Sequence, residues 1–194
     1  MKRRLFVLWL ALCSGAAVAG DILDQVRALL NPAEIAQGRF RQEKQLAFLN
    51  KPLLSEGEFV YWQRGGVIWK TLTPVASTLL VGDERMLSDQ GEQTMPPSFG
   101  RLIPALLGGD LARLREDFAV SGDVKDRRWR LQFVPKDPVV AKAIAEVVLS
   151  GDNDLRGLDI REVEGNQSRI AFDNISHPSQ LTPEQAAEFE RLSP

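Results

Sequence analysis

The chain has 194 residues, of which 44% are hydrophobic and 26% charged, and its formal net charge is −2. This length suits a single domain that buries roughly 70% of its unfolded surface. With 26 acidic and 24 basic residues, neither nucleic acid nor an anionic membrane is expected as the main partner.

Residues 1–20 have the pattern of a secretory signal peptide. MKRR is basic, LFVLWLAL is a short apolar run, and Ala17-Val18-Ala19 offers a cleavage site. The run is too short to span a bilayer. Cys13 suggests a lipid-modified cysteine as the alternative, but Leu12 precedes it, where a small residue is usual. We therefore expect a signal peptide at 1–19 and one domain at 20–194.

The exported domain differs from the full chain in two ways. Without Lys2, Arg3 and Arg4, the 24 basic residues become 21 against 26 acidic ones, a net charge of −5. The domain also contains no cysteine, so burial alone has to stabilise it in an envelope compartment where disulfides would be possible.

The first element predicted is a short amphipathic helix over 21–31, followed by a further turn over 32–37. Its apolar face consists of residues at helical spacing: Ile22, Leu23, Val26, Leu29 and Leu30. Short alternating runs separated by turn residues then predict strands at 38–48, 55–63, 67–73, 76–82 and 85–89.

A second helical segment is predicted within 98–118. Its apolar stripe consists of Ile103, Leu106, Leu107, Leu111 and Leu114. Pro104 and Gly108-Gly109 interrupt the stripe and weaken the helix, by roughly 3 kcal/mol for the proline and about 1 for each glycine. Two interpretations stay open, a moving part and a helix–turn–helix packed on the core.

Strands return at 118–123, 127–135, 146–152, 155–163 and 167–175. Asp137-Pro138 looks like the start of a short helix over 139–147, and Thr182-Pro183-Glu184-Gln185 is a capping box that begins a last helix. We predict an α+β fold with about ten or eleven antiparallel strands and apolar helices.

The domain is poor in catalytic groups. His177 is its only histidine, so zinc sites and Cys–His nucleophiles are excluded. GDNDLRG at 151–157 faintly resembles a calcium loop but lacks the distal glutamate, and a hairpin turn explains it better. A glycosidase-like carboxylate pair stays open. We predict no catalytic residue, no metal and no cofactor, and thus no enzyme.

The hairpin GEFVYWQRGGVIW at 57–69 is unusually apolar. A three-residue turn at 64–66 would place on one face Phe59, Tyr61, Val67 and Trp69. A two-residue turn would instead gather Val60, Trp62 and Trp69. Both faces are apolar either way, which indicates a curved sheet around apolar space, or side chains that simply fill a barrel.

Several motifs resemble the periplasmic lipoprotein carrier (LolA) family, in the order and spacing that this family uses. They are F-x-Q at Phe40–Gln42, S-x-G-x-F-x-Y at Ser55–Tyr61, Gly66, Trp69, Pro74, ALLGGD at Ala105–Asp110, Phe118, W-x-L-x-F-x-P-K at Trp129–Lys136, LRGLDI at 155–160 and G-N-Q-S-R-I-A-F-x-N at Gly165–Asn174. The resemblance covers nearly the whole mature chain.

The resemblance implies an incomplete β-barrel in the periplasm, lidded by helices over an acyl-binding cavity. The residues that would line the cavity are Phe40, Phe59, Tyr61, Trp69, Leu131, Phe133, Ile160, Ile170 and Phe172. The lid would be formed by Leu23, Val26, Leu30, Ile103, Leu106 and Leu107. The implied function is to shuttle lipoprotein acyl chains, or another amphiphilic lipid, as a monomer from an inner-membrane exporter to an outer-membrane acceptor.

Two features depart from the family pattern. The arginine that latches the lid in the family falls on Gln63, followed by Arg64, which makes these two residues the possible latch. The closing aromatic-proline segment is missing. A divergent branch that exports another lipid-like product, such as a polyene or a glycolipid ester, resembles the chain more closely. The alternative function is a protein-interaction or stress-sensing module of the same shape without lipid transfer.

Overall fold

The fold was analysed in a computed structural model, which describes residues 21–31, 33–82, 85–88, 91–94, 105, 111 and 114–191. The predicted signal peptide therefore lies outside the described residues, as does most of the interrupted helical segment. None of the helices in the described ranges has the length and hydropathy needed to span a bilayer.

Eleven strands form one antiparallel sheet, so the predicted α+β fold is confirmed. The strands are β1 (Ile35–Gln45), β2 (Leu53–Trp62), β3 (Gly66–Thr73), β4 (Ser77–Val81), β5 (Arg85–Ser88), β6 (Gly91–Thr94), β7 (Phe118–Lys125), β8 (Arg128–Pro135), β9 (Ile144–Gly151), β10 (Leu155–Glu162) and β11 (Gln167–Ser176). The helical elements are α1 (Ile22–Arg27), α4 (Leu114–Asp117), the 3₁₀ turn η1 (Val140–Lys142) and α5 (Pro183–Glu190).

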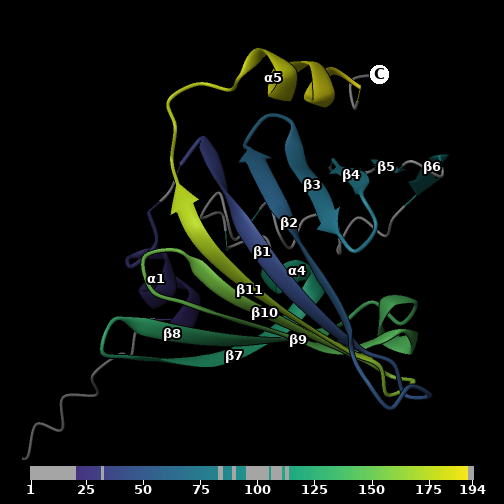
Figure 1. Cartoon of the computed structure of the whole chain (residues 1–194). Helices are drawn as coiled ribbons and strands as arrows, with labels where there is room; N and C mark the ends of the chain where they lie inside the picture. Colours follow the sequence, from purple (N-terminus) through teal and green to yellow (C-terminus); the bar gives the residue numbers. More distant parts are fainter. Residues whose placement is uncertain are drawn as a thin grey trace, which may run out of the picture.

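The sheet consists of two meanders joined at its centre. Its order is β6-β5-β4-β3-β2-β1-β11-β10-β9-β8-β7, so β1 and β11 unite the meanders and β6 and β7 are the two edges. The edges do not pair with each other, and the sheet curves as an unclosed barrel with α1 and α4 on its inner side (Figure 1).

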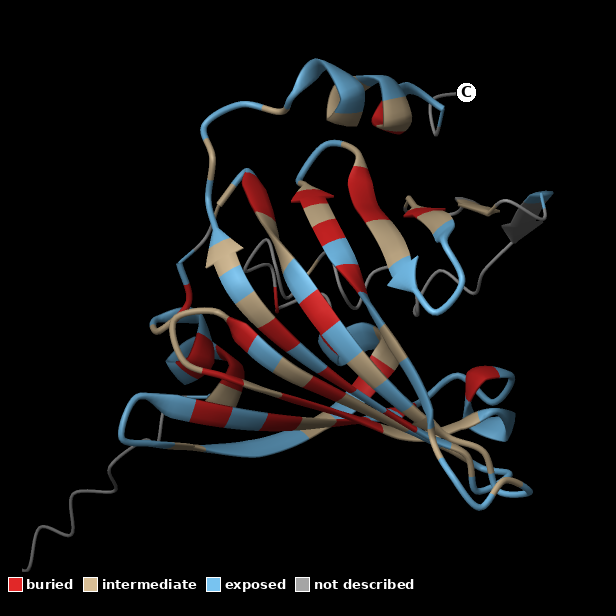
Figure 2. Ribbon diagram, viewed as in Figure 1, coloured by how far each residue is buried: buried red, intermediate tan, exposed pale blue. Residues whose placement is uncertain are grey.

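Alternation along the strands determines which residues face the helices. In β8, Trp129, Leu131 and Phe133 are buried whereas the residues between them are more exposed. The same red and pale bands alternate along the central strands in Figure 2. One face of the sheet therefore carries the main apolar core, as the two-residue period of a strand requires.

The β2–β3 hairpin has a three-residue turn, and the first of the two predicted groupings is confirmed. Phe59 pairs with Trp69 and Tyr61 with Val67, so these side chains share the inner face. The turn comprises residues 63–65, one residue earlier than predicted, because Trp62 pairs with Gly66. Gly66 has φ +94, a conformation that favours glycine.

The outer face of this hairpin is also apolar, but not because of the curved sheet or filled barrel that the sequence indicated. On the outer face, Ile68, Leu80 and Phe189 form a separate buried cluster, and Trp62 packs against it. The rings of Trp62 and Phe189 lie 5.4 Å apart. Curvature around apolar space thus accounts for the inner face only, whereas the outer face is apolar because α5 covers it.

Four local features differ from the predictions. Residues 35–37 continue β1 and form no turn, because they pair with β2. The helix predicted over 139–147 is reduced to η1, and β9 begins at Ile144. A strand that was not predicted, β6, pairs with β5. The N-terminal helix is also shorter than expected, ending at Arg27.

Two capping predictions are confirmed. Thr182 accepts a hydrogen bond from the Gln185 amide at the start of α5, and the Gln185 side chain accepts one from the Thr182 amide. Asp137 accepts hydrogen bonds from the amides of Val139 and Val140 before η1. These polar residues satisfy amide groups that have no partner within a helix.

Candidate functional site

The inner face of the sheet gathers all nine residues predicted for the cavity. They belong to one apolar cluster that draws on β1, β2, β3, β8, β10 and β11. Seven of them are buried, and Trp69 and Ile160 are partly buried. Strand register brings distant parts of the chain together here, since Phe40 lies opposite Phe172 and Phe59 opposite Trp69.

Aromatic rings form the floor of this face. Phe40 stacks on Trp69 with ring centroids 3.9 Å apart, and Phe172 meets Phe59 edge-on at 5.4 Å. A second pair, Phe118 and Phe133, lies 5.9 Å apart toward the β7 edge. The side chains are closely packed in this structure, so an additional molecule has to displace something that now covers them.

Helix α1 packs against β7 and places its apolar face in the same cluster. Leu23, Val26 and Leu30 belong to the same cluster as the aromatic rings, as the predicted apolar face of this helix requires. Leu111 and Leu114 also join the cluster. The other predicted lid residues, Ile103, Leu106 and Leu107, lie outside the described residues.

The N-terminus of α1 is held by polar contacts. Asp21 caps the helix by accepting a hydrogen bond from the Leu23 amide at 3.0 Å. The same carboxylate forms an ion pair with Arg115 of α4. Both side chains are nearly half exposed, so this pair contributes only about 0–1 kcal/mol to stability.

A hollow of about 610 Å³ opens where the first turn of α1 meets the edge strand β7. It is lined by Asp21, Ile22, Leu23, Arg115, Phe118, Ala119, Val120 and Lys136. Leu23 and Phe118 are also members of the apolar core, so the inner wall of the hollow is the core itself. Its volume is within the roughly 300–1,000 Å³ common for small-molecule sites.

Sequence reasoning did not assign Phe118 or Val120 to the site, nor Trp129, Val147, Leu149 and Leu158, which join the same cluster. The signal was present in the sequence, because each of these residues is in phase with a predicted strand. The order of strands in the sheet was the missing information.

The possible latch residues lie on the β2–β3 turn. The Gln63 amide donates to the Glu34 carbonyl at 2.8 Å. The Arg64 guanidinium lies 3.9 Å from the Glu34 carboxylate, and both side chains are mostly exposed. These contacts reach the segment before β1. A contact of Gln63 or Arg64 with the lid stays a prediction, whereas α1 is tied to α4 by Asp21 and Arg115.

A second hollow, of about 360 Å³, lies on the outer face of the sheet. Charged residues dominate its lining, and Arg169 lies between Glu43 at 3.7 Å and Asp159 at 3.2 Å. Arg161 pairs with Glu146 at 2.8 Å. Since these charges would have to lose water beside a hydrocarbon chain, this hollow is a poor site for one.

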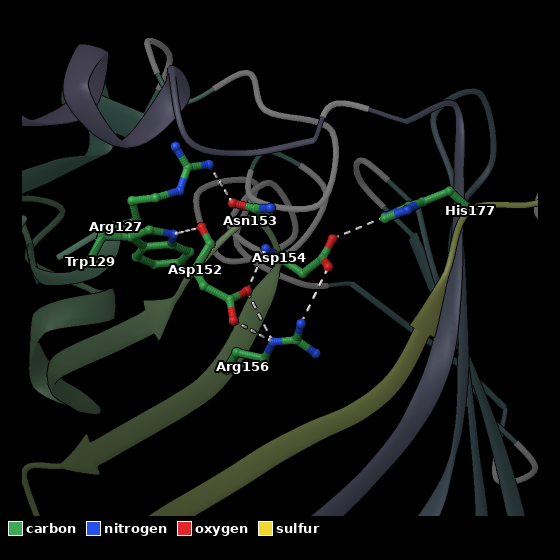
Figure 3. Close-up of polar contacts among 7 residues, drawn as sticks. All are labelled: Arg127, Trp129, Asp152, Asn153, Asp154, Arg156 and His177. Atoms are coloured by element: carbon green, nitrogen blue, oxygen red, sulfur yellow. Dashed lines mark hydrogen bonds and ion pairs between the residues drawn. The ribbon is translucent and has the colours of Figure 1, made fainter.

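The motif GDNDLRG forms the β9–β10 hairpin, as expected (Figure 3). Asp152 accepts from Arg156 at 3.1 Å and from the Asp154 amide. Partial burial alone would raise the pKa of the Asp152 carboxyl, but these hydrogen bonds and the charge of Arg156 outweigh it and lower the pKa below its ordinary value. His177 contacts Asp154 at 3.1 Å and thus ties the end of β11 to the hairpin.

The described residues contain no group of three His, Cys, Asp or Glu side chains that could hold a metal ion. The hairpin also connects distant segments: Asn153 accepts from Arg127 at 3.0 Å, and its carbonyl accepts from the Asn31 amide beyond α1. Trp129 donates its ring N–H to the Asp152 carbonyl at 2.7 Å. These contacts give the hairpin a structural role, since they join β8, β10 and the segment that follows α1.

Nearly the whole chain is similar to known proteins. Residues 13–187 match the model of the family described as outer membrane lipoprotein carrier protein LolA-like. The outer-membrane lipoprotein carrier protein of Ralstonia nicotianae is 27% identical over 184 residues, which cover 89% of this chain and 84% of that protein.

Two solved structures are also similar. A LolA superfamily protein from Nitrosomonas europaea has a TM-score of 0.46 at 12% identity, covering 84% of this chain and 94% of its own. A DUF1329 family protein from Desulfovibrio piger has a TM-score of 0.49 at 11% identity, covering 88% and 94%.

Proposed function

The chain belongs to the outer membrane lipoprotein carrier protein LolA-like family, and from this premise we propose that it is a periplasmic carrier of acyl chains. It takes up the acyl part of a lipoprotein, or of another lipid-like molecule, and shuttles it from the inner to the outer membrane. The proposal includes no chemical step, so the protein acts by binding and release.

One observation carries this proposal: a six-residue helix places its apolar face in the same cluster as the aromatic floor. The side chains of α1 in this cluster are aliphatic, and the hollow of about 610 Å³ adjoins Leu23. Acyl chains replace aliphatic side chains without leaving a polar group unpaired. The nine inner-face residues would then form the floor of the site, and Leu23, Val26 and Leu30 would be part of its lid.

Burial energies explain why a carrier needs such a cover. Each methylene removed from water is worth about 0.8 kcal/mol, so a chain of about 16 carbons gains roughly 13 kcal/mol. A permanently open cavity would expose its aromatic floor when empty. If α1 has to leave the apolar cluster for cargo to enter, part of the binding energy is used to displace it, and release to an acceptor becomes possible.

The partners follow from the direction of transport. An inner-membrane exporter or releasing complex supplies the cargo to the monomeric carrier, and an outer-membrane acceptor receives it. Ile103, Leu106 and Leu107 would complete the lid, and Gln63 or Arg64 would hold it closed.

Native mass spectrometry of the protein purified from its own envelope tests this function directly, because a carrier is expected to retain a co-purified lipid. A second test uses the three tryptophans of the exported domain. Trp69 lies on the inner face and Trp62 on the outer face beside α5. A fatty acid with a nitroxide on its chain should quench Trp69 in a variant that lacks Trp62 and Trp129.

The matched control keeps Trp62 and replaces Trp69 and Trp129 by phenylalanine. Quenching of Trp69 but not of Trp62 supports acyl binding on the inner face. Equal quenching, or none in either variant, contradicts it. A protein partner captured without any lipid uptake would favour the interaction or stress-sensing module.

A further inference from the structure

The hollow at the β7 edge is the entrance from solvent to the apolar core nearest α1. Ile22 and Leu23 of α1 form one wall, and Phe118 and Val120 of β7 form the other. Helix α1 packs against β7, which is a free edge of the sheet. Leu23 and Phe118 are members of the core cluster, so these two walls give a hydrocarbon chain an apolar route from the hollow to the core.

The described residues at the rim of the hollow carry an excess of positive charge. Among them, the charged lining residues are Arg115, Lys136 and Asp21, two cations and one carboxylate. Glu116 and Asp117 follow Arg115 in α4 but do not line the hollow. Since the walls are apolar and the rim is cationic, an amphiphile with an anionic headgroup complements both parts.

Backbone contacts position the Lys136 ammonium and connect its strand to α4. The Lys136 ammonium donates to the Arg115 carbonyl at 2.6 Å. The Lys136 amide donates to the Asp117 carbonyl at 2.8 Å, which joins the end of β8 to α4. The Lys136 ammonium therefore stays beside α4 and the apolar opening when the α1 side of the hollow moves.

We propose that Arg115 and Lys136 bind the anionic headgroup, a carboxylate or a phosphate, of the carried amphiphile, which rests on the proposed carrier function. The headgroup takes the place of Asp21 on Arg115. A guanidinium forms paired hydrogen bonds with either oxyanion, and an exposed ion pair contributes little net stability that would oppose the exchange.

The exchange also affects the lid, because Asp21 caps α1. Once its carboxylate leaves Arg115, the first turn of α1 is no longer tied to α4. Headgroup binding thereby loosens a helix whose apolar face belongs to the core cluster. The ligand class that fits both parts of the hollow also favours opening of the lid.

The test measures dissociation constants of four twelve-carbon probes by calorimetry. Dodecanoate and dodecyl phosphate are anionic, dodecyl maltoside is neutral and dodecyltrimethylammonium is cationic. We expect both anions to bind at least about tenfold more tightly than the maltoside, and the trimethylammonium probe most weakly. Comparing the two anions distinguishes a carboxylate from a phosphate headgroup.

Variants then assign the effect to the rim. The double variant Arg115→Gln, Lys136→Gln should lose about tenfold in affinity for the anions and less than about twofold for the maltoside. Asp21→Asn keeps a capping side chain but removes the competing charge, so it should bind anions more tightly. Arg41→Gln, which removes an exposed Arg–Asp pair on another part of the sheet, is the matched control and should bind as the unaltered protein does.

Each outcome has a distinct meaning. Equal affinities for all four headgroups, or equal loss of anion and maltoside binding in the double variant, overturn the headgroup assignment and leave the carrier function intact. If no probe binds the unaltered protein, both proposals are wrong. If the double variant does not fold, Asp21→Asn still decides, because unchanged or weaker anion binding contradicts the proposed exchange.

Discussion

Val26→Ala tests whether α1 is a lid or a permanent part of the core. Val26 has no exposed surface and does not line the hollow at β7. Burial of Leu23, Val26 and Leu30 stabilises docking of α1 by about 4.5–9 kcal/mol in total, at roughly 1.5–3 kcal/mol for each side chain. Ordering a six-residue helix costs about 6–12 kcal/mol. The two contributions nearly cancel, so α1 should open at low cost.

The substitution removes about 1.6 kcal/mol of burial from the closed state only. The apparent affinity for an apolar probe should then increase about tenfold, because the binding-competent open state becomes more populated. The free energy of unfolding should fall by less than 1.6 kcal/mol, because the substitution destabilises only the closed folded state and leaves the open folded state unchanged. Urea denaturation and probe titration of the same samples measure both quantities.

Val147→Ala is the matched control, because Val147 is equally buried in the same cluster but belongs to the central strand β9. It should lower the free energy of unfolding by about 2 kcal/mol without tightening probe binding. If Val26→Ala destabilises the protein as much as Val147→Ala and leaves probe affinity unchanged, α1 is an obligatory part of the core and the lid is refuted.

Three further predictions concern other parts of the fold. Phe189→Ala should lower the free energy of unfolding by about 3–5 kcal/mol in urea denaturation and leave probe binding unchanged, because Phe189 packs on the outer face. Gly66→Ala should destabilise more than Gly91→Ala in thermal unfolding. Both glycines have positive φ and incur about 1 kcal/mol of strain, but only at Gly66 would a Cβ overlap the Val81 carbonyl. The pKa of Asp152 is lowered in the folded state, so its carboxylate contributes to the free energy of unfolding above the ordinary pKa of 3.8. That contribution is lost as the pH falls through the lower pKa of the folded state. Asp152→Asn should therefore reduce the acid sensitivity of the unfolding midpoint below about pH 4, by less than about 1 kcal/mol because the side chain is partly exposed; an unchanged acid profile would contradict this.

Sequence patterns predicted most of the strands because alternation is a local property. Trp129, Leu131 and Phe133 are separated by polar residues, and that spacing is sufficient for a strand with one buried face. The capping roles of Thr182 and Asp137 could also be predicted from the sequence, because each side chain accepts hydrogen bonds from amides within three residues of its own position.

The wrong local predictions share a physical reason. The predicted turn over 32–37 and the predicted helix over 139–147 each contain alanines and a glutamate, and these residues favour helices. In the structure, Ala36 pairs with Tyr61 and Val147 with Phe133. Pairing with distant strands outweighs a helix propensity of a few tenths of a kcal/mol per residue.

The sequence by itself determined the period of each strand, the apolar face of the first helix and the membership of a carrier family, because these depend on residue types at fixed spacing. Only the tertiary structure decided that α5 covers the outer face of the β2–β3 hairpin and that Asp21 meets Arg115 beside Phe118. These contacts join residues about a hundred positions apart, and their geometry depends on the order and curvature of eleven strands, which no local pattern encodes.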